Sequence, residues 1–211
     1  MTVSLILYYA PGACSIASHI ALQEAQIPFD LRSVALGAGE QRSPDFLALN
    51  PKGRIPLVIT PFGPLTENPA ILEYVAALAP EGQLAPVNDA SKLAKMREFN
   101  CFLSATVHGA HAHGPRGGRW AKTESALQDM KAQVADNMLS AFELIEQTLQ
   151  SGPWVLGKRL LDCRCLPLYL CPLVGDGPGG YAGTEAGPCP SSTNGAAASS
   201  QSRFGRRGYC L

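Results

Sequence analysis

The sequence predicts an α+β region over its first 80 residues, followed by a region made only of helices. In the first region, runs with strand and helix character alternate in the order βαβαββα. A linker containing Pro and Gly follows at residues 81–89 and marks a domain boundary. Beyond it, apolar residues recur at helical spacing. We therefore expect domains at 1–80 and 90–159 and treat residues 160–211 separately.

The first expected strand and helix are joined by a turn that carries a cysteine. Residues 3–8 are apolar and rich in β-branched or aromatic side chains, and Pro11-Gly12 ends this strand. A helix is expected from residue 15 to about 26. Cys14 therefore stands at a helix N-terminus, where free N–H groups and the helix dipole favour a thiolate and lower a thiol pKa from about 8.5. The alternative role is that of a small buried residue.

The other elements of the first region follow from turn residues and apolar runs. Ser43-Pro44 predicts an N-cap and a proline in the first turn of a short helix that ends at Leu49. Pro56 begins an interior strand, where it cannot donate to the ladder, and this indicates a special geometry such as a cis bond. The remaining expected segments are strands at 29–34, 55–59 and 64–66 and a helix that opens at 67.

Two long helices are expected in the second region. The first runs from about residue 90 to 113 and is interrupted by Gly114–Gly118. The second runs from Thr123 to Gln150. Met130 and Met138 recur at helical spacing within it, so we expect them in the core.

Composition argues against several classes of partner. Seventeen basic and seventeen acidic residues cancel and the pI is about 6.9, so neither nucleic acid nor an anionic membrane is an expected partner. The N-terminus lacks the basic start of a signal peptide, and the first apolar run is too short to span a bilayer, so we expect a cytoplasmic location. Five of the seven cysteines follow residue 160, which does not suggest a disulfide framework.

Four short segments are informative in combination: Tyr8–Ser15, Asn50–Pro56, Leu65–Ile71 and Gly152–Gly157. In order and spacing, over residues 1 to about 159, they resemble the cytosolic glutathione S-transferases, most closely the bacterial beta class. The resemblance implies a thioredoxin-like N-terminal domain, an all-α C-terminal domain and a homodimer. It also implies a detoxification enzyme that joins glutathione, its co-substrate, to a small electrophile.

The resemblance assigns roles to the residues that would bind glutathione. Cys14 matches the family cysteine that lies against the glutathione sulfur and can form a mixed disulfide with it. Pro56 matches the family's cis-proline, which turns the backbone of Ile55 toward the cysteinyl unit of glutathione. Glu67 and Asn68 match the acidic and polar pair that receives the γ-glutamyl end.

The resemblance also implies an acceptor pocket, to which we assign Tyr9, His108 and Arg116. Arg116 and Arg119, with Trp120, are expected either to edge this pocket or to cap the end of the helix. His108 matches a beta-class histidine near the cysteine, and it is expected to donate to the sulfur or hold a proton near it. His108, His111 and His113 together also suggest a metal site. On a helix these three side chains fan out over different faces, however, so no metal is expected.

Two positions depart from the family pattern. No residue of the segment 36–42 matches the beta-class lysine that pairs with the glycyl carboxylate of glutathione. Cys101 stands where the beta class has an asparagine. Three functions therefore stay open: a transferase, a glutaredoxin-like reductase or peroxidase, and a non-catalytic or inactive protein of the same fold.

The resemblance stops after Arg159. Family members continue there with a Ser/Thr-x-x-Asp capping box, whereas this chain reads Leu160–Tyr169. Back-translated and read one nucleotide later, this segment permits the family's residues, so we interpret the ending as frameshifted and the second domain as incomplete. Residues 174–211 hold nine glycines and only three Leu, Ile, Val, Met or Phe residues, which predicts disorder. We expect no zinc at Cys163, Cys165 and Cys171.

Overall fold

The computed structural model describes residues 5–80 and 84–148 of the 211-residue chain. The N-terminal elements have the order βαβαββα, as predicted from the sequence. They are β1 (Leu5–Tyr9), α1 (Ser15–Glu24), β2 (Phe29–Ser33), α2 (Pro44–Leu49), β3 (Leu57–Thr60), β4 (Gly63–Thr66) and α3 (Asn68–Leu78). Two short 3-10 turns, η1 (Leu36–Ala38) and η2 (Glu40–Arg42), lie between β2 and α2.

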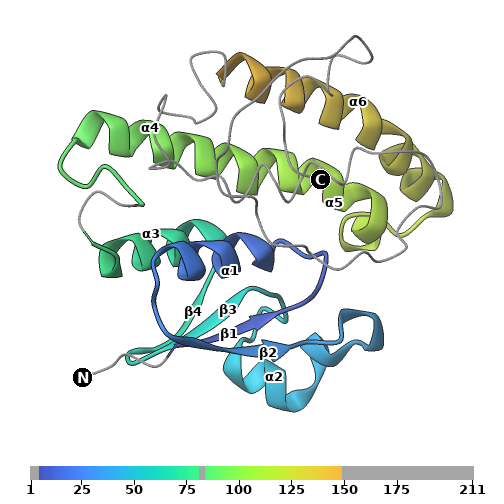
Figure 1. The fold of residues 1–211 in the computed structure, drawn as a ribbon. Coiled ribbons are helices and arrows are strands. Elements are labelled where there is room, and N and C mark those ends of the chain that lie inside the picture. Colours follow the sequence, from blue (N-terminus) through green and yellow to red (C-terminus); the bar gives the residue numbers. More distant parts are fainter. Residues whose placement is uncertain (1–4, 81–83, 149–211) are drawn as a thin grey trace, which may run out of the picture. The chain divides into compact units, whose positions relative to one another are not determined.

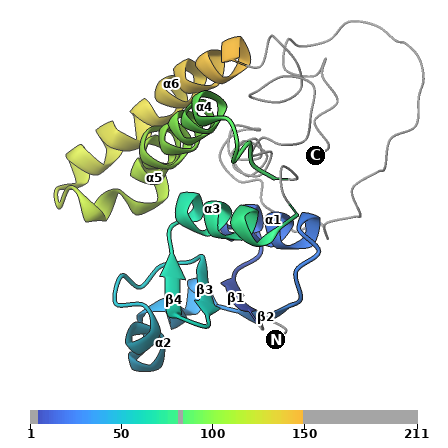
Figure 2. The same cartoon turned by 90° about the vertical axis from the view of Figure 1, so that its left-hand side faces the viewer.

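The four strands form one mixed sheet in the order β2-β1-β3-β4. β1 pairs parallel with β2 and antiparallel with β3, and β3 pairs antiparallel with β4. α1 and α3 lie side by side on one face of the sheet and α2 lies on the other (Figures 1 and 2). Covering both faces explains why Leu57 and Val58, adjacent in β3 and pointing to opposite faces, are both fully buried.

The structure confirms two turn predictions. The Ser43 hydroxyl accepts a hydrogen bond from the Phe46 N–H at 3.2 Å, so Ser43 is the N-cap of α2. The Ile55–Pro56 peptide bond is cis. β3 begins at Leu57, two residues later than the sequence suggested, because Pro56 has no N–H to give to a ladder.

In the described part of the second region, the first two of three helices are joined without a break in helical geometry. α4 (Ala90–Cys101) continues through a π-helical segment, η3 (Phe102–Val107), into α5 (His108–Arg116). A 3-10 turn, η4 (Gly117–Arg119), follows, and α6 (Glu124–Thr148) packs against α5. No helix in the described part of the chain is long and apolar enough to cross a membrane.

The helix ends within the predicted interruption at Gly114–Gly118, but it continues further into this segment than expected. α5 continues through Gly114 and Pro115 and ends at Arg116. Packing explains this, because a Cβ on Gly114 would lie only 3.4 Å from a Val134 methyl of α6, and such tertiary contact outweighs low helix propensity. A second irregularity, which the sequence did not indicate, is the π-helical segment η3 directly before His108.

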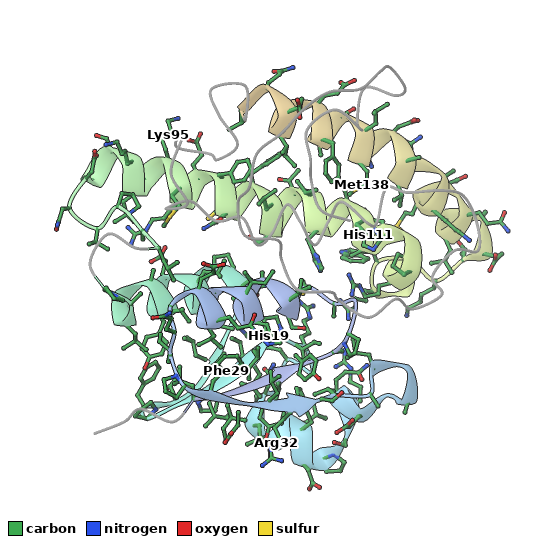
Figure 3. All side chains as sticks on the ribbon, viewed as in Figure 1. His19, Phe29, Arg32, Lys95, His111 and Met138 are labelled. Carbon is green, nitrogen blue, oxygen red and sulfur yellow. The ribbon has the colours of Figure 1, made fainter. Side chains whose placement is uncertain are left out.

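One hydrophobic core joins the sheet, α1 and α3 to α4, η3 and α6. Leu7 of β1 and Ile71 of α3 are fully buried in it, and Leu103 and Met138 join it from the helical region. Met138 projects from α6 in Figure 3, which agrees with its predicted core position. Because this one core contains residues from both sides of the expected linker, the domain limits at 1–80 and 90–159 stay predictions. The proposed frameshift, the tail and its cysteines lie outside the described residues.

Candidate active site

A buried serine fixes the loop that presents Cys14. The Ser15 hydroxyl accepts from the Ala10 N–H at 3.2 Å and donates to the Ala10 carbonyl oxygen at 3.3 Å. Ser15 is fully buried, so neither hydrogen bond is exposed to water. These two contacts close the turn between β1 and α1 and leave Cys14 at the N-cap of α1, as predicted. Ser15 is a supporting residue whose role the sequence did not reveal.

The Cys14 thiol is half-buried and points toward the loop before β3. Its sulfur donates to the carbonyl oxygen of Ile55 at 3.7 Å. Burial raises the pKa of Cys14 to about 11, although the charge of Arg116 and a backbone N–H act in the opposite direction. The predicted low pKa is therefore wrong, because the cost of burying a thiolate exceeds the help of the helix N-terminus. At neutral pH Cys14 is a hydrogen-bond donor.

Asn68 ties the start of α3 to the start of α1. Its amide nitrogen donates to the Cys14 carbonyl oxygen at 2.9 Å, and its amide oxygen accepts from the Ser18 hydroxyl at 2.7 Å. Asn68 and Ser18 are both buried. Both ends of the amide thus serve internal contacts that hold Cys14, and a contact between Asn68 and the γ-glutamyl end stays a prediction.

Glu67 precedes α3 in an unusual conformation, with φ at +73°. Its carboxylate pairs with the Lys52 ammonium at 2.7 Å, and the same ammonium donates to the Thr66 hydroxyl at 2.7 Å. Both charged side chains are more than half exposed, at 51% for Lys52 and 59% for Glu67. The sequence placed Glu67 here but did not indicate this lysine partner, because the two residues meet only through the loop before β3.

His108 is held by an arginine from the end of its own helix. An Nη2 hydrogen of Arg116 is donated to the His108 Nε2 at 3.2 Å. Because arginine can only donate, Nε2 is the acceptor and the ring proton of His108 lies on Nδ1. Burial and, to a smaller extent, the charges of Arg116, His111, Arg119 and Arg54 together lower the pKa of His108 to about 4. His108 is therefore neutral at pH 7, and proton transfer from it to a sulfur stays a prediction.

Tyr9 lies in an aromatic group on the α1 side of the sheet. Its ring centroid is 6.0 Å from that of His19, which in turn meets Phe29 edge-on at 5.5 Å. Figure 3 shows His19 directed from α1 toward Phe29 on β2. Burial lowers the pKa of His19, in agreement with a packed histidine. The assignment of Tyr9 to an acceptor pocket stays a prediction.

The remaining expected positions are placed as follows. Cys101 is exposed, whereas the neighbouring Asn100 is buried. His111 is half-buried beside His108, and His113 meets Trp120 edge-on at 4.5 Å. Among the described residues, no three His, Cys, Asp or Glu side chains form a cluster that could hold a metal ion.

Comparison with known proteins agrees with this arrangement. The family described as Glutathione S-transferase, N-terminal domain, matches residues 3–77. Glutathione S-transferase GST-4.5 of Xanthomonas campestris is 31% identical over 151 residues, which cover 72% of this chain and 73% of that protein. The chain belongs to the glutathione S-transferase family.

Solved structures of this family share the fold. A glutathione transferase homologue from Sulfitobacter, solved with bound glutathione, has a TM-score of 0.78 and 40% identity, covering 82% of this chain and 83% of its own. A beta-class glutathione S-transferase from Sphingomonas chungbukensis has a TM-score of 0.67 and 28% identity, covering 79% and 81%. These similarities confirm the thioredoxin-like N-terminal region that the sequence motifs implied.

Proposed function

We propose that this glutathione S-transferase joins glutathione to small electrophiles at the site around Cys14. The observation that carries the proposal is the protonated Cys14 thiol, which donates to the Ile55 carbonyl oxygen. A glutathione sulfur bound beside Cys14 would accept this S–H in place of the carbonyl. Such a donor stabilises the glutathione thiolate, and the positive charge of Arg116 acts in the same direction.

The bond changes in this proposal involve the glutathione sulfur alone. Its lone pair forms a C–S bond to the electrophilic carbon, the bond to the leaving group breaks, and that group departs with the bonding pair. The glutathione thiol proton passes to solvent when the thiolate forms. Cys14 keeps its own proton throughout and acts as a hydrogen-bond donor.

The rest of glutathione is proposed to lie along the loop before β3 and the start of α3. The backbone of Ile55 would pair with the cysteinyl unit in the manner of an added strand. The Glu67 carboxylate, held in place by Lys52, would accept from the γ-glutamyl ammonium. N–H groups at the N-terminus of α3 would face the γ-glutamyl carboxylate. On family grounds we also propose a cytoplasmic homodimer with a detoxification role.

A second candidate function is thiol–disulfide exchange through Cys14, in which Cys14 attacks oxidised glutathione and releases one reduced glutathione. The position of the thiol beside Ile55, whose backbone is proposed to pair with the cysteinyl unit of glutathione, favours this candidate. Its pKa of about 11 predicts that this reaction is slow at neutral pH and accelerates as the pH rises.

The test compares Cys14→Ala with Cys14→Ser in the full chain, using chlorodinitrobenzene as the electrophile and calorimetry for glutathione binding. We expect the alanine variant to lose about 10²-fold in kcat, as when other single donors to a developing negative charge are removed, and the serine variant to lose less. Equal kcat in Cys14→Ala and the unaltered protein would overturn the role of Cys14. Absence of glutathione binding would favour the non-catalytic alternative.

Mass measurement after incubation with oxidised glutathione tests the second candidate. The expected adduct is one glutathionyl group that forms faster at higher pH and is lost in Cys14→Ala. A glutathionyl adduct mapped to other cysteines only would exclude exchange through Cys14.

A further inference from the structure

Four arginines around the proposed site lack a carboxylate partner among the described residues. The ion pairs of that part of the chain involve Lys52, Lys92, Lys95 and Arg97 instead. Two of the four arginines come from the N-terminal region, and two from the end of α5 and from η4. They are Arg42, Arg54, Arg116 and Arg119.

The charges of these arginines act on one another. The pKa of Arg119 is lowered by burial and by the positive charges of Arg116, Arg54 and Arg42. Arg54 and Arg119 also act on His108, to which Arg116 donates its hydrogen bond. Arg116 acts in addition on Cys14. The four side chains therefore form one positive group, whose members come from η2, the loop before β3, the end of α5 and η4.

Backbone geometry brings Arg42 next to Arg54. Gly53 has φ at +58°, and a Cβ at this position would lie 2.8 Å from the Arg42 Nη1 and 2.9 Å from the Gln41 carbonyl oxygen. The guanidinium of Arg42 thus crosses the backbone directly before Arg54. Only glycine allows both this conformation and this approach.

Arg116 has donor capacity that the described residues do not use. Its side chain is half-buried, and its Nε is buried without a hydrogen-bond partner in the described part of the chain. Glu67, whose negative charge acts on Cys14, is already paired with Lys52. Grouped positive charges repel one another, and an unpaired buried donor costs free energy. A bound anion would relieve both costs, and the planar guanidinium fork suits a carboxylate.

We propose that the preferred electrophile of this site carries a carboxylate, bound by Arg116 and Arg119 with support from Arg54. The proposal rests on the proposed transferase function and names its class of acceptor. Trp120, which follows Arg119 and is 53% exposed, offers an apolar surface for the body of such a molecule. The glycyl carboxylate of glutathione is the other source of the same chemistry, and the experiment separates the two.

The experiment uses chloronitrobenzoate and its methyl ester, two electrophiles with the same reacting carbon. In both, the glutathione sulfur forms the C–S bond and chloride leaves with the C–Cl bonding pair, while the thiol proton passes to solvent. Rates are divided by the uncatalysed rates with free glutathione, which removes the difference in intrinsic reactivity. We expect the normalised kcat/KM to favour the carboxylate by about tenfold or more, because a charge-assisted bidentate pair is strong.

Single arginine variants identify the groups responsible. Arg119→Gln is expected to reduce the preference for the carboxylate by about tenfold, mainly through the KM of the electrophile. Arg32→Gln is the matched control, because it removes the same charge from β2 and Arg32 is not among the charges acting on Cys14, His108 or Arg119. We expect it to leave the preference unchanged. Added salt should weaken the carboxylate reaction more than the ester reaction.

Each outcome has a distinct meaning. Equal normalised rates for acid and ester overturn the proposal while leaving the transferase function intact. A rise in the KM of glutathione in Arg119→Gln, with the acid-to-ester preference retained, overturns it in favour of the glycyl carboxylate. Absence of conjugation with both electrophiles and with chlorodinitrobenzene means that the transferase function itself has failed.

Discussion

The two sides of the proposed site differ in whether their polar groups have partners within the described part of the protein. On the N-terminal side, Ser15, Asn68 and Glu67 all have partners inside the protein, at 2.7 to 3.3 Å. On the helical side, Arg116 donates to a neutral histidine, and Arg119 has no carboxylate partner among the described residues.

The N-terminal side is therefore already arranged to hold Cys14, whereas the helical side would be stabilised by binding an anion. Groups that are already paired hold Cys14 and Ile55 in place with little cost of rearrangement on binding. Unbalanced positive charge costs free energy, and a bound anion would reduce that cost. Changes on the N-terminal side should therefore alter stability or the thiol, and changes on the helical side should alter pH dependence and selectivity.

The largest expected effect is on the helical side and concerns the pH dependence of stability. His108 has a pKa of about 4 in the folded protein against 6.5 as its ordinary value, so the unfolded chain binds more protons between these two pH values. The free energy of unfolding should fall by roughly 2–3 kcal/mol as the pH decreases from 6.5 to 4. The pKa values of His111 and His19 are also lowered, so these residues add to the same trend.

Urea unfolding at several pH values measures this effect. The groups whose charges act on His108 are Arg116, His111, Arg119 and Arg54. The control is His108→Gln, which should show a shallower pH dependence than the unaltered protein. Identical slopes in the two proteins would contradict the neutral, buried state of His108.

The next effect concerns the reactivity of the thiol. With a pKa of about 11, Cys14 has on the order of 10²-fold less thiolate at pH 8 than an ordinary thiol with a pKa of about 8.5. Iodoacetamide should therefore alkylate Cys14 about 10²-fold more slowly than an ordinary cysteine thiol in a short peptide, as followed by peptide mass mapping. Alkylation of Cys14 as fast as that of the peptide thiol would contradict the raised pKa and favour the thiolate predicted from the helix N-terminus.

A smaller effect is expected from the hydrogen bonds of Asn68 that hold Cys14 in position. Asn68→Ala removes the acceptor of the buried Ser18 hydroxyl and the donor to the Cys14 carbonyl oxygen. We expect a loss of about 2 kcal/mol in the free energy of unfolding, because both partners lose a hydrogen bond. Ser18→Ala removes one of the two contacts and should cost about half as much. Equal costs in urea unfolding would show that the contact with Cys14 contributes little.

The smallest effect is expected at the exposed pair of Lys52 and Glu67. Both side chains are mostly solvated, so Lys52→Met should change the free energy of unfolding by less than about 1 kcal/mol. Calorimetry should nevertheless detect weaker glutathione binding, because Glu67 loses the group that holds it in position. A large loss of stability with unchanged binding would mean that the pair serves the fold.

Some features were accessible from the sequence because they depend on neighbouring residues. The N-cap at Ser43, the cis bond before Pro56 and the position of Cys14 at a helix start all follow from local backbone chemistry. The order βαβαββα follows from apolar periodicity and turn residues. These features need no knowledge of distant contacts.

Other features depend on residues far apart in the chain. The contact between Asn68 and Cys14 spans 54 positions, and the pairing of Lys52 with Glu67 also requires a folded loop. The path of α5 through Pro115 and the π-helical segment before His108 were not predicted, since both reflect packing between helices. No local pattern shows that Arg116 and Arg119 lack a carboxylate partner among the described residues.

The sequence by itself determined the order of the elements, the family, and the residue types at the start of α1 and before β3, because these depend on short-range patterns. Only the tertiary structure decided the protonation of Cys14 and His108 and the grouping of the arginines. The physical reason is that desolvation and Coulomb interactions depend on what surrounds a group in space. The helix start favoured a thiolate at Cys14, but burial reversed that local preference.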